Sequence, residues 1–215
     1  MSNCNNFIPK NGIDDELLEY SDQIVQSDDI LPTWNAQKQG QCTCQDYEQL
    51  SPHLHAELMN GYIVARAPVS FMHQAVITEL LCQIVTYGKK TNSPYKAVTF
   101  PIHFYLNGGN TILIPDIALL LQPGRITGNE IRSVPFFTAE VLSSDSRYTD
   151  CTVKFHLYRT LGIREYWMID PKIEAVTVCL FNMKEINEIK EYSFTERIPV
   201  RTLEGFWLDF KNLRR

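Results

Sequence analysis

The chain of 215 residues lacks any apolar run approaching the roughly 18–20 residues that a helix needs to span a bilayer. Its first residues, MSNCNNFIPKNG, have neither the charged segment nor the apolar core of a signal peptide. With no export signal, we expect the six cysteines to be reduced and the protein to be cytoplasmic. Cys42 and Cys44 have no partners at zinc-ligand spacing, and Cys82 and Cys179 lie in apolar segments typical of buried thiols.

A strong basic patch is also missing, and the net charge of −5 is unevenly distributed. Residues 1–50 hold nine acids and two bases, a formal charge of −7. The other 165 residues hold 16 acids and 18 bases, a formal charge of +2. We therefore interpret residues 1–45 as an acidic N-terminal extension and residues 46–215 as one domain, whose near-neutral body can approach a polyanion.

The composition, with 44% apolar and 21% charged residues, is that of an ordinary globular protein with one good core. Residues 14–25 are typical of a short amphipathic helix. DYEQL followed by HAELMNGYIVARAP indicates a short helix, a turn at Asn60-Gly61 and a strand that ends at Pro68. Apolar residues at helical spacing predict a helix over 70–88, with Ser70 as its N-cap and Gly88 as its stop.

Further strands are predicted at 96–100, 102–106, 111–121 and 136–142, with a loop at 122–135. A helix of about 151–161 follows, capped by Thr149 or Asp150 and ended by Gly162. Later strands are expected at 164–170 and 175–181, with strand-like pieces near 186–193 and 206–210. This order predicts a mixed α/β or α+β fold, in which a sheet carries helices.

Three charged residues stand out in this pattern. Asp116 follows a proline inside an apolar strand, Glu140 lies within the apolar run TAEVL, and Lys154 lies early in the following helix. A buried carboxylate is costly unless something pairs with it. Two carboxylates on adjacent strands can bind one divalent cation such as Mg²⁺. Such a cation can activate water and stabilise charge on a phosphate, and a nearby lysine can assist.

Strand alternation puts Glu140 on the same face as Thr138 and Leu142. In the commonest nuclease pattern the catalytic lysine lies two residues after the acid, which here is Leu142. Lys154 is the residue that could fill this role from the helix. Without further context Asp150 could be a helix cap, whereas Arg147 and Tyr148 could meet a phosphate.

Several stretches together resemble the Uma-type putative restriction endonucleases, a branch of the PD-(D/E)XK nuclease superfamily. They are ELMNG (57–61), the helix with His73, IPDIALL (114–120), AEVLSSDSRYTDCTVKFHLYRTLGIREYWMIDP (139–171) and EGFWLDF (204–210). The resemblance covers about residues 46–210. The sequence departs from the family pattern at Ser144-Asp145, where the family more often has Ser-Pro-Ser.

The resemblance implies a mixed central β-sheet flanked by helices and a metal-dependent endonuclease that hydrolyses phosphodiester bonds. It implies that Asp116 and Glu140 bind Mg²⁺ or Mn²⁺, that Lys154 is a displaced catalytic lysine, and that Glu57 and His73 lie near the same cleft. DNA is the expected substrate, and a homodimer is the expected assembly.

Two alternatives stay open at this stage. The first is a catalytically idle module of the same fold that binds nucleic acid or protein, which the near-neutral body and acidic extension favour. The second is a hydrolase of small phosphodiesters, because one metal and two carboxylates do not select a polymer. A further hypothesis is that the acidic extension covers the cleft and competes with DNA.

Overall fold

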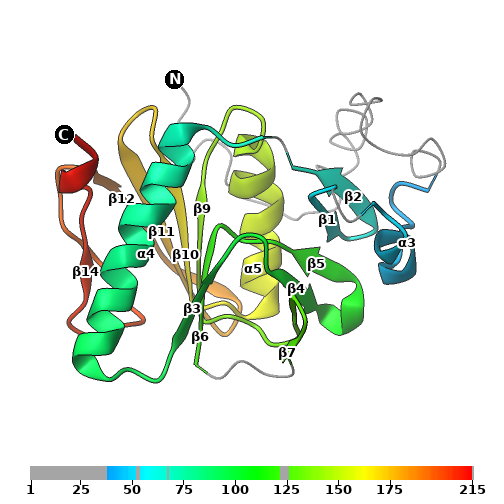
Figure 1. Cartoon of the computed structure of the whole chain (residues 1–215), viewed down its shortest axis with the longest axis horizontal. Helices are drawn as coiled ribbons and strands as arrows, with labels where there is room; N and C mark the ends of the chain where they lie inside the picture. The colour runs from blue at the N-terminus through cyan, green and yellow to red at the C-terminus, as the bar shows by residue number, and fades with distance from the viewer. Residues whose placement is uncertain (1–37, 52–53, 67, 122–125, 215) are drawn as a thin grey trace.

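The computed structural model describes residues 38–51, 54–66, 68–121 and 126–214 (Figure 1). The helix predicted at 14–25, and most of the acidic extension with its proposed covering role, lie outside these described residues. No helix in the described ranges is long and apolar enough to cross a membrane.

The helices are α3 (Cys44–Glu48), α4 (Phe71–Thr91) and α5 (Phe155–Leu161), the last preceded by a π-helix, Thr149–Lys154. The strands are β1 (Ala56–Met59), β2 (Tyr62–Ala65), β3 (Lys96–Thr99), β4 (His103–Leu106), β5 (Thr111–Leu113), β6 (Ile117–Leu120), β7 (Ile126–Thr127), β8 (Glu130–Ile131), β9 (Phe137–Val141), β10 (Glu165–Asp170), β11 (Ala175–Asn182), β12 (Glu185–Ser193), β13 (Ile198–Pro199) and β14 (Trp207–Leu208). Short 3₁₀ turns occur at Asn107–Gly109 and Lys211–Arg214.

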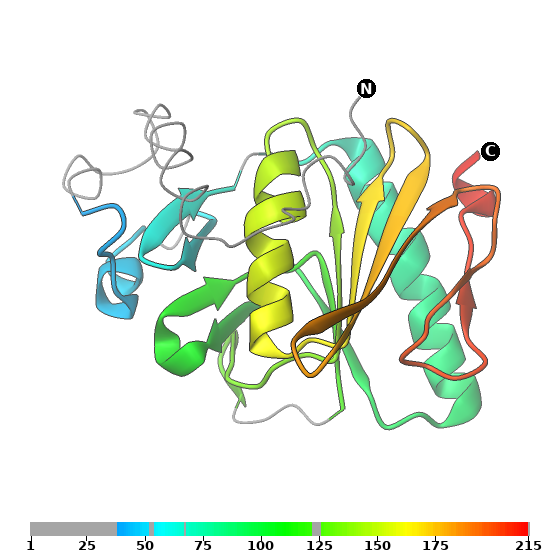
Figure 2. The ribbon, with the colours of Figure 1, turned by 180° about the vertical axis from the view of Figure 1, so that it is seen from behind.

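Among the described residues, two six-stranded sheets form the body of the protein. The first has the order β2-β1-β5-β4-β8-β7 and the second the order β12-β11-β10-β9-β6-β3. In the second sheet β9 and β10 run parallel, and the other neighbours are antiparallel. The helices α4 and α5 cover opposite faces of this sheet, as the two views in Figures 1 and 2 show. The predicted mixed α+β fold, a mixed sheet flanked by helices, is confirmed.

Alternating side chains of the second sheet supply two separate cores, as the period of a strand requires. On one face, Val76, Leu80 and Ile84 of α4 pack with Ala139 and Val141 of β9. The other face has its own cluster, formed by Leu142, Phe155, Leu157, Tyr158, Tyr166 and Met168. Each fully buried side chain of this kind contributes roughly 1.5–3 kcal/mol. Glu140 alternates with Ala139 and Val141, so its carboxylate lies on the α5 side with Leu142, as predicted.

The single strand predicted at 111–121 is wrong, because the chain changes sheets in the middle of this segment. β5 belongs to the first sheet and β6 to the second. Pro115 lies between them, and a proline has no N–H to continue a strand ladder. As a consequence, Asp116 lies at the crossing between the sheets, directly before β6.

The helix α4 begins as predicted but ends later. The Ser70 hydroxyl accepts a hydrogen bond from the backbone N–H of His73 at 3.2 Å. Gly88 does not stop the helix, which continues to Thr91 and ends at Asn92 in the left-handed conformation with φ 51°. Gly88 instead makes room for Tyr95, because a Cβ atom there would lie 2.8 Å from the tyrosine hydroxyl oxygen.

Three further local expectations need correction. The segment before Asn60 contains α3, but Ala56–Met59 is a strand that pairs with β2 across the Asn60-Gly61 turn. Positive φ at both Asn60 and Gly61 suits a tight hairpin. Neither Thr149 nor Asp150 caps a helix, since both lie within the π-helix. Cys82 is exposed on α4, whereas Cys179 is buried.

Candidate active site

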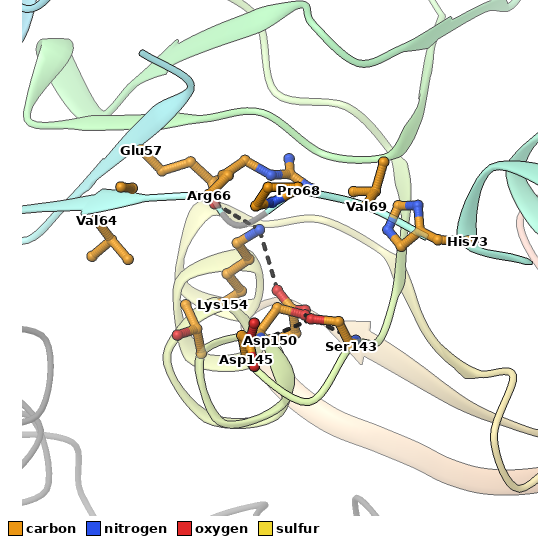
Figure 3. Close-up of a pocket in the computed structure, with 13 residues that line it drawn as sticks. Glu57, Val64, Arg66, Pro68, Val69, His73, Ser143, Asp145, Asp150 and Lys154 are labelled. Carbon is orange, nitrogen blue, oxygen red and sulfur yellow. Dashed lines mark hydrogen bonds and ion pairs between the residues drawn. The ribbon is translucent and has the colours of Figure 1, made fainter. Parts of the chain in front are cut away.

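A small polar cavity, which we call the acidic cavity, lies where the two sheets, α4 and the π-helix meet. Its volume is about 90 Å³, several times the roughly 10–15 Å³ that one water molecule occupies on this measure. It is lined by Glu57, Val64, Ala65, Arg66, Pro68, Val69, His73, Ser143, Asp145, Ser146, Thr149, Asp150 and Lys154 (Figure 3). Asp116 and Glu140 lie directly behind this lining and contact Arg66, His73 and Lys154.

Adjacent antiparallel strands bring Asp116 and Glu140 together. Ile117 on β6 pairs with Ala139 on β9, so the residues next to them in the two strands are neighbours. The backbone N–H of Asp116 lies 3.3 Å from Glu140 Oε2, and the N–H of Val141 donates to Asp116 Oδ2 at 2.8 Å. Both carboxylates are nearly inaccessible to solvent. The predicted proximity of these two acids is therefore present in the structure.

Lys154 lies at the centre of a cluster of carboxylates. Its Nζ is 2.8 Å from Glu57 Oε2, 3.0 Å from Glu140 Oε1 and 3.2 Å from Asp150 Oδ1. In Figure 3 its side chain extends between Glu57 and Asp150. The π-helix that carries Asp150 and Lys154 is a rare conformation that occurs frequently at functional sites. The ammonium group of Lys154 thus reaches Glu140 from the helix. In the commonest nuclease pattern the lysine lies on the strand, at the position that Leu142 occupies here.

Glu57 links the first sheet to this cluster. Its Oε1 accepts a hydrogen bond from the backbone N–H of Ile114 at 2.7 Å, while Oε2 contacts Lys154. Ile114 lies directly before the Pro115 crossing. Glu57 therefore contacts both the backbone just before Asp116 and the lysine that pairs with Glu140.

His73 approaches Asp116 from the first turn of α4. Its Nε2 lies 3.1 Å from Asp116 Oδ2, within the distance at which the ring N–H can donate a hydrogen bond to this carboxylate. The Nδ1 atom is buried and has no hydrogen-bond partner among the described residues. The structure brings His73, like Glu57, into the same site as the two acids and Lys154.

Sequence reasoning missed Arg66 and Tyr158. Arg66 Nη2 lies 2.7 Å from Asp116 Oδ1 and 4.0 Å from Glu140 Oε2, and Nη1 donates to the Ile114 carbonyl. The Tyr158 hydroxyl donates to Glu140 Oε1 at 2.7 Å. An arginine in the strand YIVARA just before a proline is the signal that could have drawn attention to Arg66. Arg147, considered above as a phosphate ligand, pairs instead with Asp170.

A family model described as putative restriction endonuclease (Uma2) matches residues 44–211, most of the chain. The chain belongs to this family. The resemblance that the sequence suggested is thereby confirmed. No curated protein matches the chain.

A solved structure is also similar to this chain. It is the crystal structure, at 1.96 Å resolution, of a putative nuclease belonging to DUF820 from Anabaena variabilis ATCC 29413. The TM-score is 0.65 and the sequence identity 22%, and the match covers 80% of this chain and 96% of the other. At this identity the likeness supports the fold.

The two acids differ in their electrostatic environment. Burial raises the pKa of Asp116, but the hydrogen bond from His73, the charge of Arg66 and the N–H of Val141 outweigh it and hold the pKa at about 2. Burial raises the pKa of Glu140, and the negative charges of Asp116 and Asp150 raise it further. The charge of Lys154 lowers this pKa but does not outweigh them, so that it lies at about 8. Pairs of carboxylates whose pKa values are pushed apart are typical of functional sites.

Lys154 stays charged in this environment. Burial alone lowers the pKa of the ammonium group, but Glu140, Glu57 and Asp150 together raise it well above its ordinary value. The same balance applies to Arg66, where burial is outweighed by Glu57 and Asp116. Both side chains therefore act as positive charges and hydrogen-bond donors, not as bases.

The donor chemistry of the site fits a hard divalent cation. The four carboxylates of Glu57, Asp116, Glu140 and Asp150 face two permanent cations, which leaves an excess of negative charge when all four are ionised. Carboxylate oxygens and water are the ligands that Mg²⁺ prefers. In the described part of the chain no three or more His, Cys, Asp or Glu side chains enclose a metal position. Asp116 and Glu140 would therefore hold the ion as a pair of protein ligands, with water completing its shell.

Proposed function

We propose that this protein is a metal-dependent endonuclease that hydrolyses phosphodiester bonds of DNA, with Asp116 and Glu140 as ligands of Mg²⁺ or Mn²⁺. The observation that carries the proposal is the arrangement of these two acids on adjacent strands, with Lys154 Nζ 3.0 Å from Glu140 Oε1 beside a polar cavity. Membership of the family supports nuclease chemistry. A homodimer stays a prediction.

The residues of the chain have distinct roles in this proposal. When bound, the ion supplies a more acidic water and a positive charge close to the phosphate. Lys154, already charged, donates hydrogen bonds and stabilises negative charge that develops on the phosphate oxygens. Glu57 and Asp150 hold the lysine in position, and Tyr158 fixes the Glu140 carboxylate. His73 orients Asp116 through the 3.1 Å contact.

Cleavage of plasmid and oligonucleotide DNA with Mg²⁺, with Mn²⁺ and with EDTA tests this proposal. Asp116→Asn and Glu140→Gln should abolish cleavage while leaving the fold intact. Asp209→Asn and Glu188→Gln make the same chemical changes far from the acidic cavity, and both should keep parental activity.

The two alternatives predict other results. Parental protein that binds nucleic acid without cleaving it in either metal would support an idle module. Turnover of a generic small phosphodiester at the same rate as DNA would support a small-substrate hydrolase. Cleavage that persists in Asp116→Asn or Glu140→Gln would contradict the assignment of these ligands.

A further inference from the structure

A second cavity adjoins the acidic cavity, and we call it the aromatic cavity. Its volume is about 290 Å³, just below the roughly 300–1,000 Å³ typical of ligand pockets. It is lined by His55, Arg66, Pro68, Val69, Gln74, Phe100 and Asp116. Three of these residues, Arg66, Pro68 and Val69, also line the acidic cavity, and Figure 3 shows them between Glu57 and His73. A ligand in the aromatic cavity therefore lies directly beside Asp116.

The chemistry of the aromatic cavity differs from that of the acidic cavity. The rings of His55 and Phe100 meet edge to face with centroids 4.8 Å apart and an interplanar angle of 70°. The guanidinium carbon of Arg66 lies 5.4 Å from the centroid of the Phe100 ring. Phe100 is half-buried and His55 is exposed, so both rings present surface to the cavity. Aromatic faces beside a guanidinium favour a flat, aromatic ligand.

Polar and apolar surfaces continue from the aromatic cavity along α4. Gln74 contributes an amide group, which can both donate and accept hydrogen bonds to the edge of a ring. Gln74 and Phe100 also line a third cavity of about 420 Å³, together with Ile77, Thr78, Leu81, Cys82, Val85 and Thr99. Phe100 thus lies between two cavities and lines both of them.

We propose that the aromatic cavity binds an unpaired nucleobase of the strand whose phosphodiester bond lies at Asp116 and Glu140. The inference rests on the proposed function and specifies its substrate class, a strand with at least one unpaired base beside the bond that is cut. A base that contacts Phe100 by its face and Gln74 by its Watson–Crick edge cannot keep a Watson–Crick partner. Stacking on an aromatic ring accepts any base, so the site selects an unpaired strand more than a sequence.

The test measures binding of a single-stranded DNA oligonucleotide that contains 2-aminopurine, whose fluorescence changes on stacking. Titrations of the full chain are carried out in EDTA and in Ca²⁺, so that no cleavage is needed. Phe100→Leu keeps the bulk of the side chain but removes the ring face, and Phe100→Tyr keeps the face. We expect Phe100→Leu to weaken binding by about 5- to 150-fold and Phe100→Tyr to bind like the parent.

Two controls separate stacking from other effects. Phe71→Leu makes the same change at an exposed phenylalanine outside the cavity, with 87% exposure, and should not alter binding. An all-abasic oligomer of the same length should bind the parent more weakly, and Phe100→Leu should then cause no further loss.

Three results would overturn the inference. They are equal binding of the parent to the abasic and the normal oligonucleotide, equal binding by Phe100→Leu and the parent, and absence of binding in both EDTA and Ca²⁺. Failure of the proposed function shows separately, as intact base-dependent binding without cleavage in Mg²⁺ or Mn²⁺.

Discussion

Arg66 Nη2 lies 2.7 Å from Asp116 Oδ1 and 4.0 Å from Glu140 Oε2, so the guanidinium group lies between the two carboxylates proposed as metal ligands. Asp116 is almost fully buried, and an unpaired buried carboxylate is strongly unfavourable. In the structure described here the arginine supplies part of the positive charge that a divalent ion would supply. The effect of removing Arg66 on stability is therefore expected to be smaller when an ion is bound.

This relationship predicts the effect of Arg66→Gln on stability. Without metal, the variant should lose about 3–5 kcal/mol in free energy of unfolding, because Asp116 loses its buried partner. Mn²⁺ should restore part of that loss, so the rise in Tm on adding Mn²⁺ should be larger in the variant than in the parent. Thermal unfolding in EDTA and in Mn²⁺ measures both. Arg132→Gln removes an exposed arginine and is the matched control; equal Mn²⁺ shifts in all three proteins would refute the prediction.

Lys154→Met should be at least as destabilising. The ammonium group is the shared partner of Glu57, Glu140 and Asp150, and its loss leaves three buried acids without the cation that all of them contact. We expect a loss of about 3–5 kcal/mol in urea unfolding at neutral pH. The loss should shrink at low pH, where the acids become protonated. Lys211→Met, at an exposed surface pair, should change little; a pH-independent loss in Lys154→Met would count against the charge argument.

Glu140→Gln should change the pH dependence of stability in EDTA. Burial raises the pKa of Glu140 to about 8 in the folded protein, so the protonated form is favoured there. The stability linked to this group is fully present below the ordinary pKa of a glutamate and is lost as the pH rises through the folded value. The variant should match the parent near pH 5 and be more stable than the parent near pH 8. A Tm difference that stays constant between these pH values would show that Glu140 does not titrate this way.

Part of the site could be predicted from sequence because local pattern carries it. Glu140 has apolar neighbours on both sides, and strand alternation assigns it to the same face as Thr138 and Leu142. Lys154 lies one helical turn beyond Asp150, and the two side chains do meet. Glu57 and His73 were predicted from the stretches that resemble the family, because hydrophobic periodicity alone does not identify them.

Other parts depend on contacts between segments far apart in the chain. Arg66 follows β2 and meets Asp116 fifty positions later, only because the two sheets adjoin at Pro115. Within the apolar run 111–121, Pro115 is the sequence feature that indicates the change of sheet. The π-helix at Thr149–Lys154 has no distinctive sequence pattern, so a capped α-helix was the natural prediction there.

Binding of Mn²⁺ measured by calorimetry tests the central claim most directly. The account predicts that the parent binds the ion and that Asp116→Ala and Glu140→Ala each lose binding, whereas Glu188→Ala, on β12, keeps it. Circular dichroism of every variant establishes that it is folded. Absence of Mn²⁺ binding in the parent, or binding that is unchanged in both acid variants, would contradict the metal site and favour the idle module.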